Sequence, residues 1–598
     1  MLSCLLFFSL AAGTNMQKIY DVSSDMVAAM RDLAISAGVH TPSSAGPWSQ
    51  AELMLILKSI DTKKLNATES ELYWNIEKEL SKGLNTSVFA DPGLSANIEG
   101  TVHANPSDFT DFDWVGGFNR AGDINVPAPL VNLPYSISIG RHIYMYAELS
   151  LGLNRTIQAQ MNKIEKGKEI TFKPLIGRTN ILFLPPSVLI DFNMNFPYRA
   201  IIVAGGDNWY LSIGREKLSW GPGTSGNLLV GDQIPYHNNA RFVAFTKHFK
   251  YTFSVSSFIH PSNYTYKDPN SDCTCKSPPS NCTCKDGHCG KDYIDLFFDQ
   301  DKERIGTKAF IAHRAEFFAG RFTGALTESI IYQTATGAFD FSVFSPMALF
   351  HNYYIRGNAN SMLSIELEFA AMDHLSLYGV MLIDEFNFPT EFSDPSVPPR
   401  AMGFQLGAKT SWILKEGILH SSLEGVYTDS YLYIRDDGTR KSCGYGINAI
   451  VAFPDFINSP STEIHLANYE LMFLGYRYGN DVIVINWNTE FKATRGYDCS
   501  FDFTYIADGV KDKYTRWKTG DISKAPSSNQ GDSYLKDPEP KDAVSHFFIF
   551  TLQGGYSLTV HMRLDAAIRE ITILNVGNSS NGGTSSDFQL TAKISYAF

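Results

Sequence analysis

Residues 588–598 read Phe-Gln-Leu-Thr-Ala-Lys-Ile-Ser-Tyr-Ala-Phe, and this stretch decides the class of fold. Apolar or aromatic side chains occupy every even position, and mostly polar ones occupy the odd positions. Successive side chains of a β-strand point to opposite faces, so the stretch predicts a strand with one apolar and one polar face. Soluble sandwiches and transmembrane barrels both contain such strands.

The same alternation recurs along the chain. Residues 363–369 and 558–565 alternate with charged side chains on one face only. Residues 243–255 alternate too, although Lys247 interrupts the apolar face and is expected at a membrane interface or in a turn. A membrane-spanning strand needs about 9–11 residues, and lipid forces the sheet to close because an open edge leaves backbone groups unpaired.

The position of the last strand favours the membrane alternative. An alternating strand that ends on aromatic residues, here Tyr596 and Phe598, resembles the recognition signal of outer-membrane β-barrels, which closes the barrel against its first strand. The resemblance implies that Tyr596 and Phe598 act as an assembly signal, read by the β-barrel assembly machinery.

Composition agrees with a barrel. Only 19% of the 598 residues are charged and 13% are aromatic, while a soluble protein has about 25% charged residues. No run of about 18 apolar residues exists for a transmembrane helix. Polar stretches at residues 256–293 and 507–542 predict long loops, whereas other connections are tight. We therefore predict a mainly β fold: a large closed antiparallel transmembrane β-barrel over residues 92–598, with about 16–20 strands and 18 favoured.

The first residues indicate export. Residues 1–13 form an apolar run followed by small residues, which predicts a signal peptide, with a buried N-terminal segment as the alternative. Residues 17–88 differ from the rest of the chain because their apolar positions recur every three or four residues. They predict a small N-terminal helical bundle that docks on something larger.

Three helices are expected within this segment. Ser23 or Ser24 can cap the first and Gly38 can end it, while Ser49 and Glu52 have the spacing of a capping box for the second. The apolar stripes of the three helices are Met26, Val27, Met30, Leu33 and Ala34, then Leu53, Ile56, Leu57 and Ile60, then Leu72, Tyr73, Ile76 and Leu80.

Five of the eight cysteines lie within residues 271–293, namely Cys273, Cys275, Cys282, Cys284 and Cys289. In an exported protein such a cluster predicts disulfides, and Cys443 or Cys499 could supply a further partner. Metal binding through the two Cys-x-Cys pairs and His288 is the alternative. We expect no bound metal ion.

One segment of the barrel is distinctive: residues 214–223 read GREKLSWGPG and are followed by Asn227-Leu228-Leu229 and Ile234-Pro235. Together with His313-Arg314-Ala315-Glu316, Leu326-Thr327-Glu328, Asp384-Glu385 and residues 474–481, it resembles the Wzi family of outer-membrane β-barrels, which are implicated in assembling capsular polysaccharide. The resemblance implies an outer-membrane location, with the helical bundle in the periplasm. The implied partners are surface or capsular polysaccharide and outer-membrane lipid, and a monomer is expected.

The Trp220 segment has two interpretations. Trp220 could stack on a sugar while Arg215, Asp232 and Arg241 donate or accept hydrogen bonds. Alternatively, Gly221, Pro222 and Gly223 form a structural turn inside the lumen, where arginines and carboxylates pair. The candidate polysaccharide-binding or lumen-lining residues are Arg215, Trp220, Asp232, Arg241, His313, Arg314, Glu316, Glu328 and Asp384.

The sequence contains no phosphate-binding loop, zinc-protease helix or serine-hydrolase elbow. We therefore expect no enzymatic activity and no cofactor. A formal net charge of −12 argues against nucleic acid as a partner. The predicted function is to bind or organise surface polysaccharide; the alternative is a porin-like channel for small solutes.

Overall fold

The structure is a computed structural model. It describes residues 15–82, 88–104, 129–151, 178–179, 194–195, 199–258, 264–267, 295–298, 307–334, 341–345, 349–350, 359–386, 400–434, 448–457, 466–511, 544–578 and 581–598. The predicted signal peptide, the cysteine cluster at 273–289 and most of the loop at 507–542 lie outside these residues.

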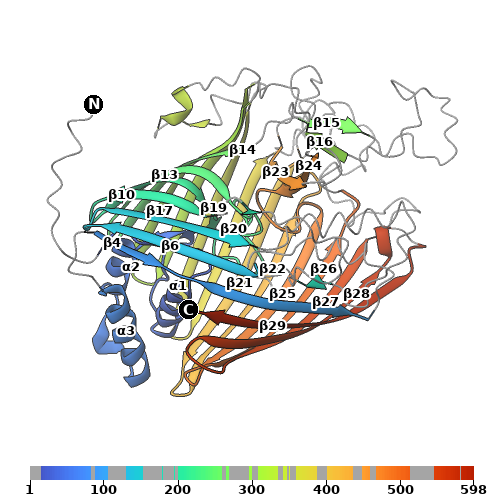
Figure 1. The fold of residues 1–598 in the computed structure, drawn as a ribbon. Helices are drawn as coiled ribbons and strands as arrows, with labels where there is room; N and C mark the ends of the chain where they lie inside the picture. The colour runs from blue at the N-terminus through green and yellow to red at the C-terminus, as the bar shows by residue number, and fades with distance from the viewer. Residues whose placement is uncertain are drawn as a thin grey trace, which may run out of the picture.

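The described strands form a closed antiparallel barrel of 18 strands (Figure 1). β4 with β5 and β9 with β10 are interrupted strands that each count as one, and the two-residue β8 (Arg178–Thr179), which pairs with β5, is not counted. In chain order the strands are β4 (Val88–Pro92) with β5 (Ser95–His103), β6 (Val131–Ile139), β7 (Ile143–Leu151), β9 (Met194–Asn195) with β10 (Ala200–Gly205), β11 (Trp209–Glu216), β13 (His237–Phe245), β14 (Phe249–Phe258), β17 (Thr307–Ala319), β18 (Phe322–Thr334), β19 (Ala359–Met372), β20 (Leu375–Glu385), β21 (Ala401–Ile413), β22 (Gly417–Thr428), β25 (Val482–Ala493), β26 (Tyr497–Asp508), β27 (Ser545–Ser557), β28 (Met562–Leu574) and β29 (Thr584–Ala597).

The last strand closes the barrel against the first, as predicted. β29 pairs with β5 from Gln589 opposite His103 to Ala597 opposite Ser95, and the Phe598 amide donates to the Leu94 carbonyl at 2.8 Å. This pairing leaves no open edge for lipid to face. The role of Tyr596 and Phe598 as an assembly signal stays a prediction.

Two of the alternating stretches are hairpins rather than single strands. Residues 243–255 turn at 246–248 between β13 and β14, which places Lys247 in the turn. Residues 558–561 form the turn between β27 and β28, so only the second half of 558–565 is strand. The alternation of polar and apolar residues continues through both turns. This pattern alone therefore does not reveal where the chain reverses direction.

The two ends of the barrel differ. Short turns at residues 140–142, 206–208, 246–248, 320–321, 373–374, 414–416, 494–496 and 558–561 lie at one end, and the long connections leave from the other. Outer-membrane barrels place short turns in the periplasm and long loops outside. At the long-loop end the described residues also include the sheet of β15 (Tyr264–Lys267), β16 (Asp295–Phe298), β24 (Leu466–Phe473) and β23 (Ile450–Ile457).

Three helices precede the barrel and lie at its short-turn end (Figure 1). They are α1 (Asp25–Ser36), α2 (Gln50–Leu57) and α3 (Ala67–Leu80), with a 3₁₀ turn, η1 (Thr62–Lys64), before α3. One apolar cluster joins Met30 and Leu33 of α1 to Leu53 of α2 and Ile76 of α3, and it includes Ile413 at the rim of the barrel. The helices therefore share a small core that is completed by the barrel.

The capping prediction was half right. The Ser49 side chain accepts a hydrogen bond from the Glu52 amide at the start of α2, but the Glu52 carboxylate binds Lys250 of the barrel instead of returning the bond. A complete capping box lies at α3, between Asn66 and Glu69. Ser24 precedes α1 without a side-chain cap bond.

The outer wall of the barrel is apolar. Exposed aliphatic side chains include Ile213, Leu367, Leu406 and Leu423, and exposed aromatic side chains include Trp209 near a short turn. This is the band expected to face acyl chains. No helix in the described part of the chain is long and apolar enough to cross a membrane.

Candidate functional site

Two segments enter the lumen from opposite ends and pair with each other. β2 (Ala45–Gly46) comes from the helical end, and β12 (Ser219–Trp220) comes from the connection between β11 and β13. Ser219 lies opposite Gly46 and Trp220 opposite Ala45, and the Gly221 amide donates to the Ser44 carbonyl at 3.0 Å. The two segments therefore meet inside the barrel, where Ala45 and Trp220 belong to one apolar core.

Buried charges of the wall hold the N-terminal segment. The Arg314 guanidinium binds both Glu366 oxygens at 2.5 and 2.9 Å and the Ser44 hydroxyl at 2.6 Å. The Ser43 hydroxyl donates to Glu316 at 2.8 Å. All five side chains are buried, so each charge depends on these partners in place of water.

A second ion pair anchors α2 to the barrel. Lys250 Nζ lies 2.6 Å from Glu52 Oε1 and 3.0 Å from the Ala45 carbonyl. Burial raises the pKa of the Glu52 carboxyl, although the nearby Lys250 ammonium acts in the opposite direction. This pair fixes the helical segment to the inner wall.

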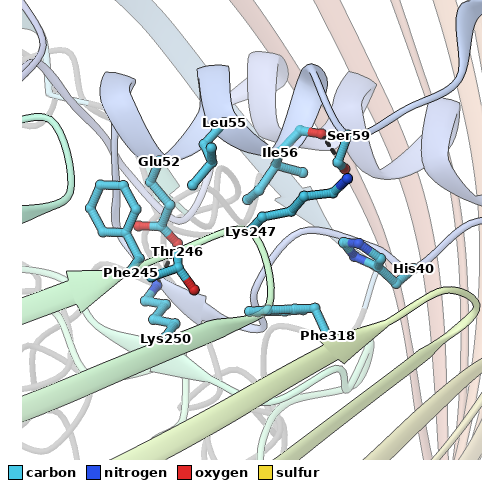
Figure 2. Close-up of a pocket in the computed structure, with 10 residues that line it drawn as sticks. All are labelled: His40, Glu52, Leu55, Ile56, Ser59, Phe245, Thr246, Lys247, Lys250 and Phe318. Carbon is cyan, nitrogen blue, oxygen red and sulfur yellow. Dashed lines mark hydrogen bonds and ion pairs between the residues drawn. The ribbon is translucent and has the colours of Figure 1, made fainter.

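A small, mostly apolar pocket lies beside this ion pair, between α2 and the ends of β13, β14 and β17 (Figure 2). Leu55, Ile56, Phe245 and Phe318 supply its apolar surface, and the Lys247 side chain extends along α2 toward Ser59. The residues that line it are His40, Glu52, Leu55, Ile56, Ser59, Phe245, Thr246, Lys247, Lys250 and Phe318.

Glu424 of β22 holds the inward loop that carries Trp220. Its carboxylate accepts bonds from the Thr224 and Ser225 amides, both at 2.9 Å, and from the Gln405 side chain at 2.8 Å. The Ser225 and Tyr378 hydroxyls donate to it as well. A single buried carboxylate thus satisfies donors from the loop and from two neighbouring strands.

The Gly-Pro-Gly sequence forms a tight turn in this loop. Gly221 has φ +135°, and a Cβ there would lie 2.4 Å from Asn227 Oδ1. The Gly223 amide donates to the same Asn227 oxygen at 2.9 Å, and Lys409 donates to the Pro222 carbonyl. Trp220 is only 1% exposed and its ring centroid lies 6.2 Å from that of Phe310. The indole is thus packed in the core and presents no free face to a sugar.

The loop-side half of the lumen is filled by further connections. Leu228 and Tyr433 lie in the same large core as Leu474 and Tyr476. The Tyr433 hydroxyl donates to the Leu228 carbonyl and accepts from the Tyr476 amide at 3.1 Å. Burial raises the pKa of this hydroxyl. Three loop segments are therefore joined through one tyrosine.

Partly exposed ion pairs border this core. Arg477 binds Asp232, whose side chain is 32% exposed. Arg400, 28% exposed, binds both oxygens of Asp429 at 2.7 and 2.8 Å. In each pair one side chain is buried and the other is partly exposed. These fixed polar groups are the described features best suited to hydrogen-bond a hydroxyl-rich ligand from the long-loop side.

The structure separates the predicted site residues into two faces. Arg241, Arg314, Glu316 and Asp384 point inward. Arg241 lies 3.8 Å from Glu216 and over the Tyr210 ring, whereas the Asp384 carboxylate accepts from Asn360 and from the Tyr433 amide. The predicted residues inside the barrel therefore serve packing and loop attachment, and Asp232 and Asp384 are partly exposed.

The expectation that His313 and Glu328 line the lumen was wrong. They lie opposite each other on β17 and β18, on the outer face of the wall, because Arg314 and Thr327 occupy the inward positions beside them. Arg215 also faces outward, opposite the exposed Asn238, whose side-chain oxygen accepts from Arg215 Nε at 3.0 Å. Adjacent residues of a strand point to opposite faces, so His313 and Arg314 cannot both line the lumen.

Glu424, Lys250 and Tyr433 are site residues that the sequence did not identify. Glu424 and Lys250 are charged residues on the inward face of alternating strands, so the alternation in the sequence could have identified them. Tyr433 lies in an irregular loop, and no periodic pattern marks it.

The cysteine predictions concern residues outside the described part of the chain, except for Cys499. Cys499 is free and exposed on β26, three positions after the short turn at 494–496. It lies near the short-turn end of the barrel, and its suggested pairing with the cysteine cluster stays a prediction. Among the described residues, no group of three His, Cys, Asp or Glu side chains could hold a metal ion.

This architecture defines an outer-membrane β-barrel. No protein-family model matches the chain, and no curated protein sequence does. Among solved structures, the chain is similar to Wzi of Escherichia coli, described as an outer-membrane, carbohydrate-binding β-barrel involved in group 1 capsule assembly. The identity is 13%, the alignment covers 98% of this chain and 100% of Wzi, and the TM-score is 0.52.

Porins match less well. The anion-selective porin from Comamonas acidovorans is 8% identical with a TM-score of 0.31, and OccAB4 of Acinetobacter baumannii is 9% identical with a TM-score of 0.37. Each alignment covers 86% of this chain and 99% of the porin. At these identities the comparisons bear on the fold alone.

Proposed function

We propose that the protein is a non-enzymatic outer-membrane barrel that binds surface polysaccharide at its long-loop end and does not conduct solutes. The pairing of Trp220 with Ala45 across the lumen carries this proposal. A diffusion channel needs a continuous water-filled path, whereas here two chain segments meet in the middle of the barrel. In this proposal the short turns and the helices lie in the periplasm.

The loop-side ion pairs support a carbohydrate ligand. Arg400–Asp429 and Arg477–Asp232 hold planar charged groups in fixed positions at the border of the core. Tyr431 lies nearby as a partly buried ring, 5.8 Å from the Lys511 ammonium. Sugars are bound by such combinations of rigid planar hydrogen-bonding groups and flat aromatic faces. The similarity in fold to the carbohydrate-binding Wzi barrel is consistent with this ligand class.

Two experiments test the proposal. First, the purified barrel is reconstituted in planar bilayers, where we expect no defined conductance steps; porin-like steps would instead establish the channel alternative. Second, binding of isolated surface polysaccharide is measured for the wild type and for Arg400→Gln, with Arg321→Gln at a short turn as the control. We expect weakened binding only for Arg400→Gln, and equal binding by both variants would remove the assigned site.

A further inference from the structure

A Phe-rich connection packs against the outside of the barrel wall. The connection between β18 and β19 includes the 3₁₀ turn η4 (Phe341–Phe344) and the described residues Leu349 and Phe350. Val343 and Phe350 are fully buried in a cluster with Ile311 of β17 and Ile330 of β18. These strand residues face outward, because Phe310 and Ile331 beside them belong to the core of the lumen.

This connection reaches well down the wall. The Phe350 ring centroid lies 4.7 Å from that of His313, and the Phe344 and Phe253 centroids are 6.4 Å apart. His313 is six positions from Ala319, the short-turn end of β17. The described residues of the connection therefore pack on the outward face of β17 between its middle and its loop-side end.

Elsewhere the barrel exposes apolar side chains at this height. Counted from the short-turn end of its own strand, Leu406 is seven positions away on β21 and Ile485 is eight positions away on β25. These side chains are 68% and 43% exposed. Outer-membrane barrels carry a continuous apolar band about 25 Å tall, so the wall that the connection covers lies within the height of this band.

A polar contact lies under the connection. The Tyr251 hydroxyl and His313 Nδ1 are 2.8 Å apart on the outer face, and the Phe253 and Phe350 rings stack on the His313 ring. Polar groups that face hydrocarbon raise the free energy of the folded protein. The Phe253 and Phe350 rings cover part of this contact, and Tyr251 and His313 remain partly exposed.

We propose that η4 and Leu349–Phe350 form a membrane-embedded outer lobe, whose surface contacts the acyl chains of outer-leaflet lipid. The lobe takes the place of the strand surface that it covers. Val343 and Phe350 pack against the outer face of the wall, and Leu349 is 64% exposed. Residues 338–354 contain no Lys or Arg and a single acidic residue, Asp340. This stretch of sequence thus carries almost no charge that would oppose contact with acyl chains, and its exposed described side chains are Ser342, Ser345 and Leu349.

Photocrosslinking in whole cells tests this lobe. p-Benzoylphenylalanine replaces Leu349 in one variant, the lipid-facing Leu406 in a positive control, and the exposed Glu71 of α3 in a negative control. Heat-modifiable migration establishes that each variant folds. We expect a lipid adduct at position 349 with a yield within about threefold of position 406, and about tenfold or more above position 71.

Other adducts would overturn the lobe proposal. A crosslinked pair of chains at 349, without lipid, would identify the lobe as an interface between copies. Absence of any lipid adduct at 349, with a normal adduct at 406, would place the lobe in water. Phe344, at the edge of the same cluster, provides a second probe position if the variant at 349 does not fold. None of these outcomes depends on polysaccharide binding.

Discussion

Trp220 lies directly opposite Ala45 in a short antiparallel ladder inside the barrel, and this pair joins a loop from one end to the N-terminal segment from the other. Ala45 and Trp220 both belong to the large apolar core inside the barrel. Buried charged groups of the wall, such as Arg314 and Lys250, bind the inserted N-terminal segment.

Replacing Trp220 with Ala should destabilise the occluding loop. The indole is fully buried, so its removal leaves a cavity and is expected to cost about 3–5 kcal/mol of unfolding free energy. Trp209→Ala is the matched control, because that indole is 47% exposed on the outer wall. Unfolding in lipid vesicles measures both variants, and equal losses would contradict the core position of Trp220.

Glu366→Ala should be severely destabilising because it leaves Arg314 buried without its main partner. Breaking a buried ion pair in this way typically costs about 3–5 kcal/mol. The exposed pair Arg321–Asp373 supplies the control: Asp373→Ala should cost about 1 kcal/mol or less. Denaturant titration of the reconstituted barrel measures both, and a double variant Arg314→Met with Glu366→Leu should recover part of the loss.

Glu424→Gln should loosen the inward loop without unfolding the barrel. A carboxylate can accept from all five donors around Glu424, whereas an amide has one accepting oxygen and turns an N–H toward donors. We expect a loss of about 1–3 kcal/mol in loop attachment. Transient conductance openings in planar bilayers are the measurement, with Glu490→Gln, at an exposed ion pair, as the control. A variant as silent as the wild type would show that other contacts hold the loop.

Acid should weaken the docking of the N-terminal segment through His40. Burial lowers the pKa of this imidazole below 6.5, with Lys247 and His248 acting in the same direction and Glu368 and the Thr41 carbonyl opposing them. The folded state therefore favours neutral His40, so its contribution is complete above about pH 6.5 and is lost as the pH falls below that value. His40→Gln should reduce the loss of stability between pH 7.5 and 5, measured by unfolding at both values. His561→Gln, at an exposed turn, should behave as the wild type does.

The barrel could be predicted from local sequence patterns. The alternation in residues 588–598 specifies which face of β29 is apolar, because the side-chain period of a strand is fixed by its backbone. Lipid then requires closure, and β29 pairs with β5 accordingly. The three helices were equally predictable, since their apolar positions repeat locally and need no knowledge of distant residues.

The contacts of the charged residues could not be predicted, because they depend on how distant segments pack. Arg314 and His313 are adjacent and both polar, yet one binds Glu366 inside the lumen and the other lies under Phe350 outside it. Trp220 is likewise a buried core residue because Ala45 meets it from the far end of the chain. Local periodicity reports the two faces of a strand, but which face is covered, and by what, depends on loops that return from distant parts of the sequence.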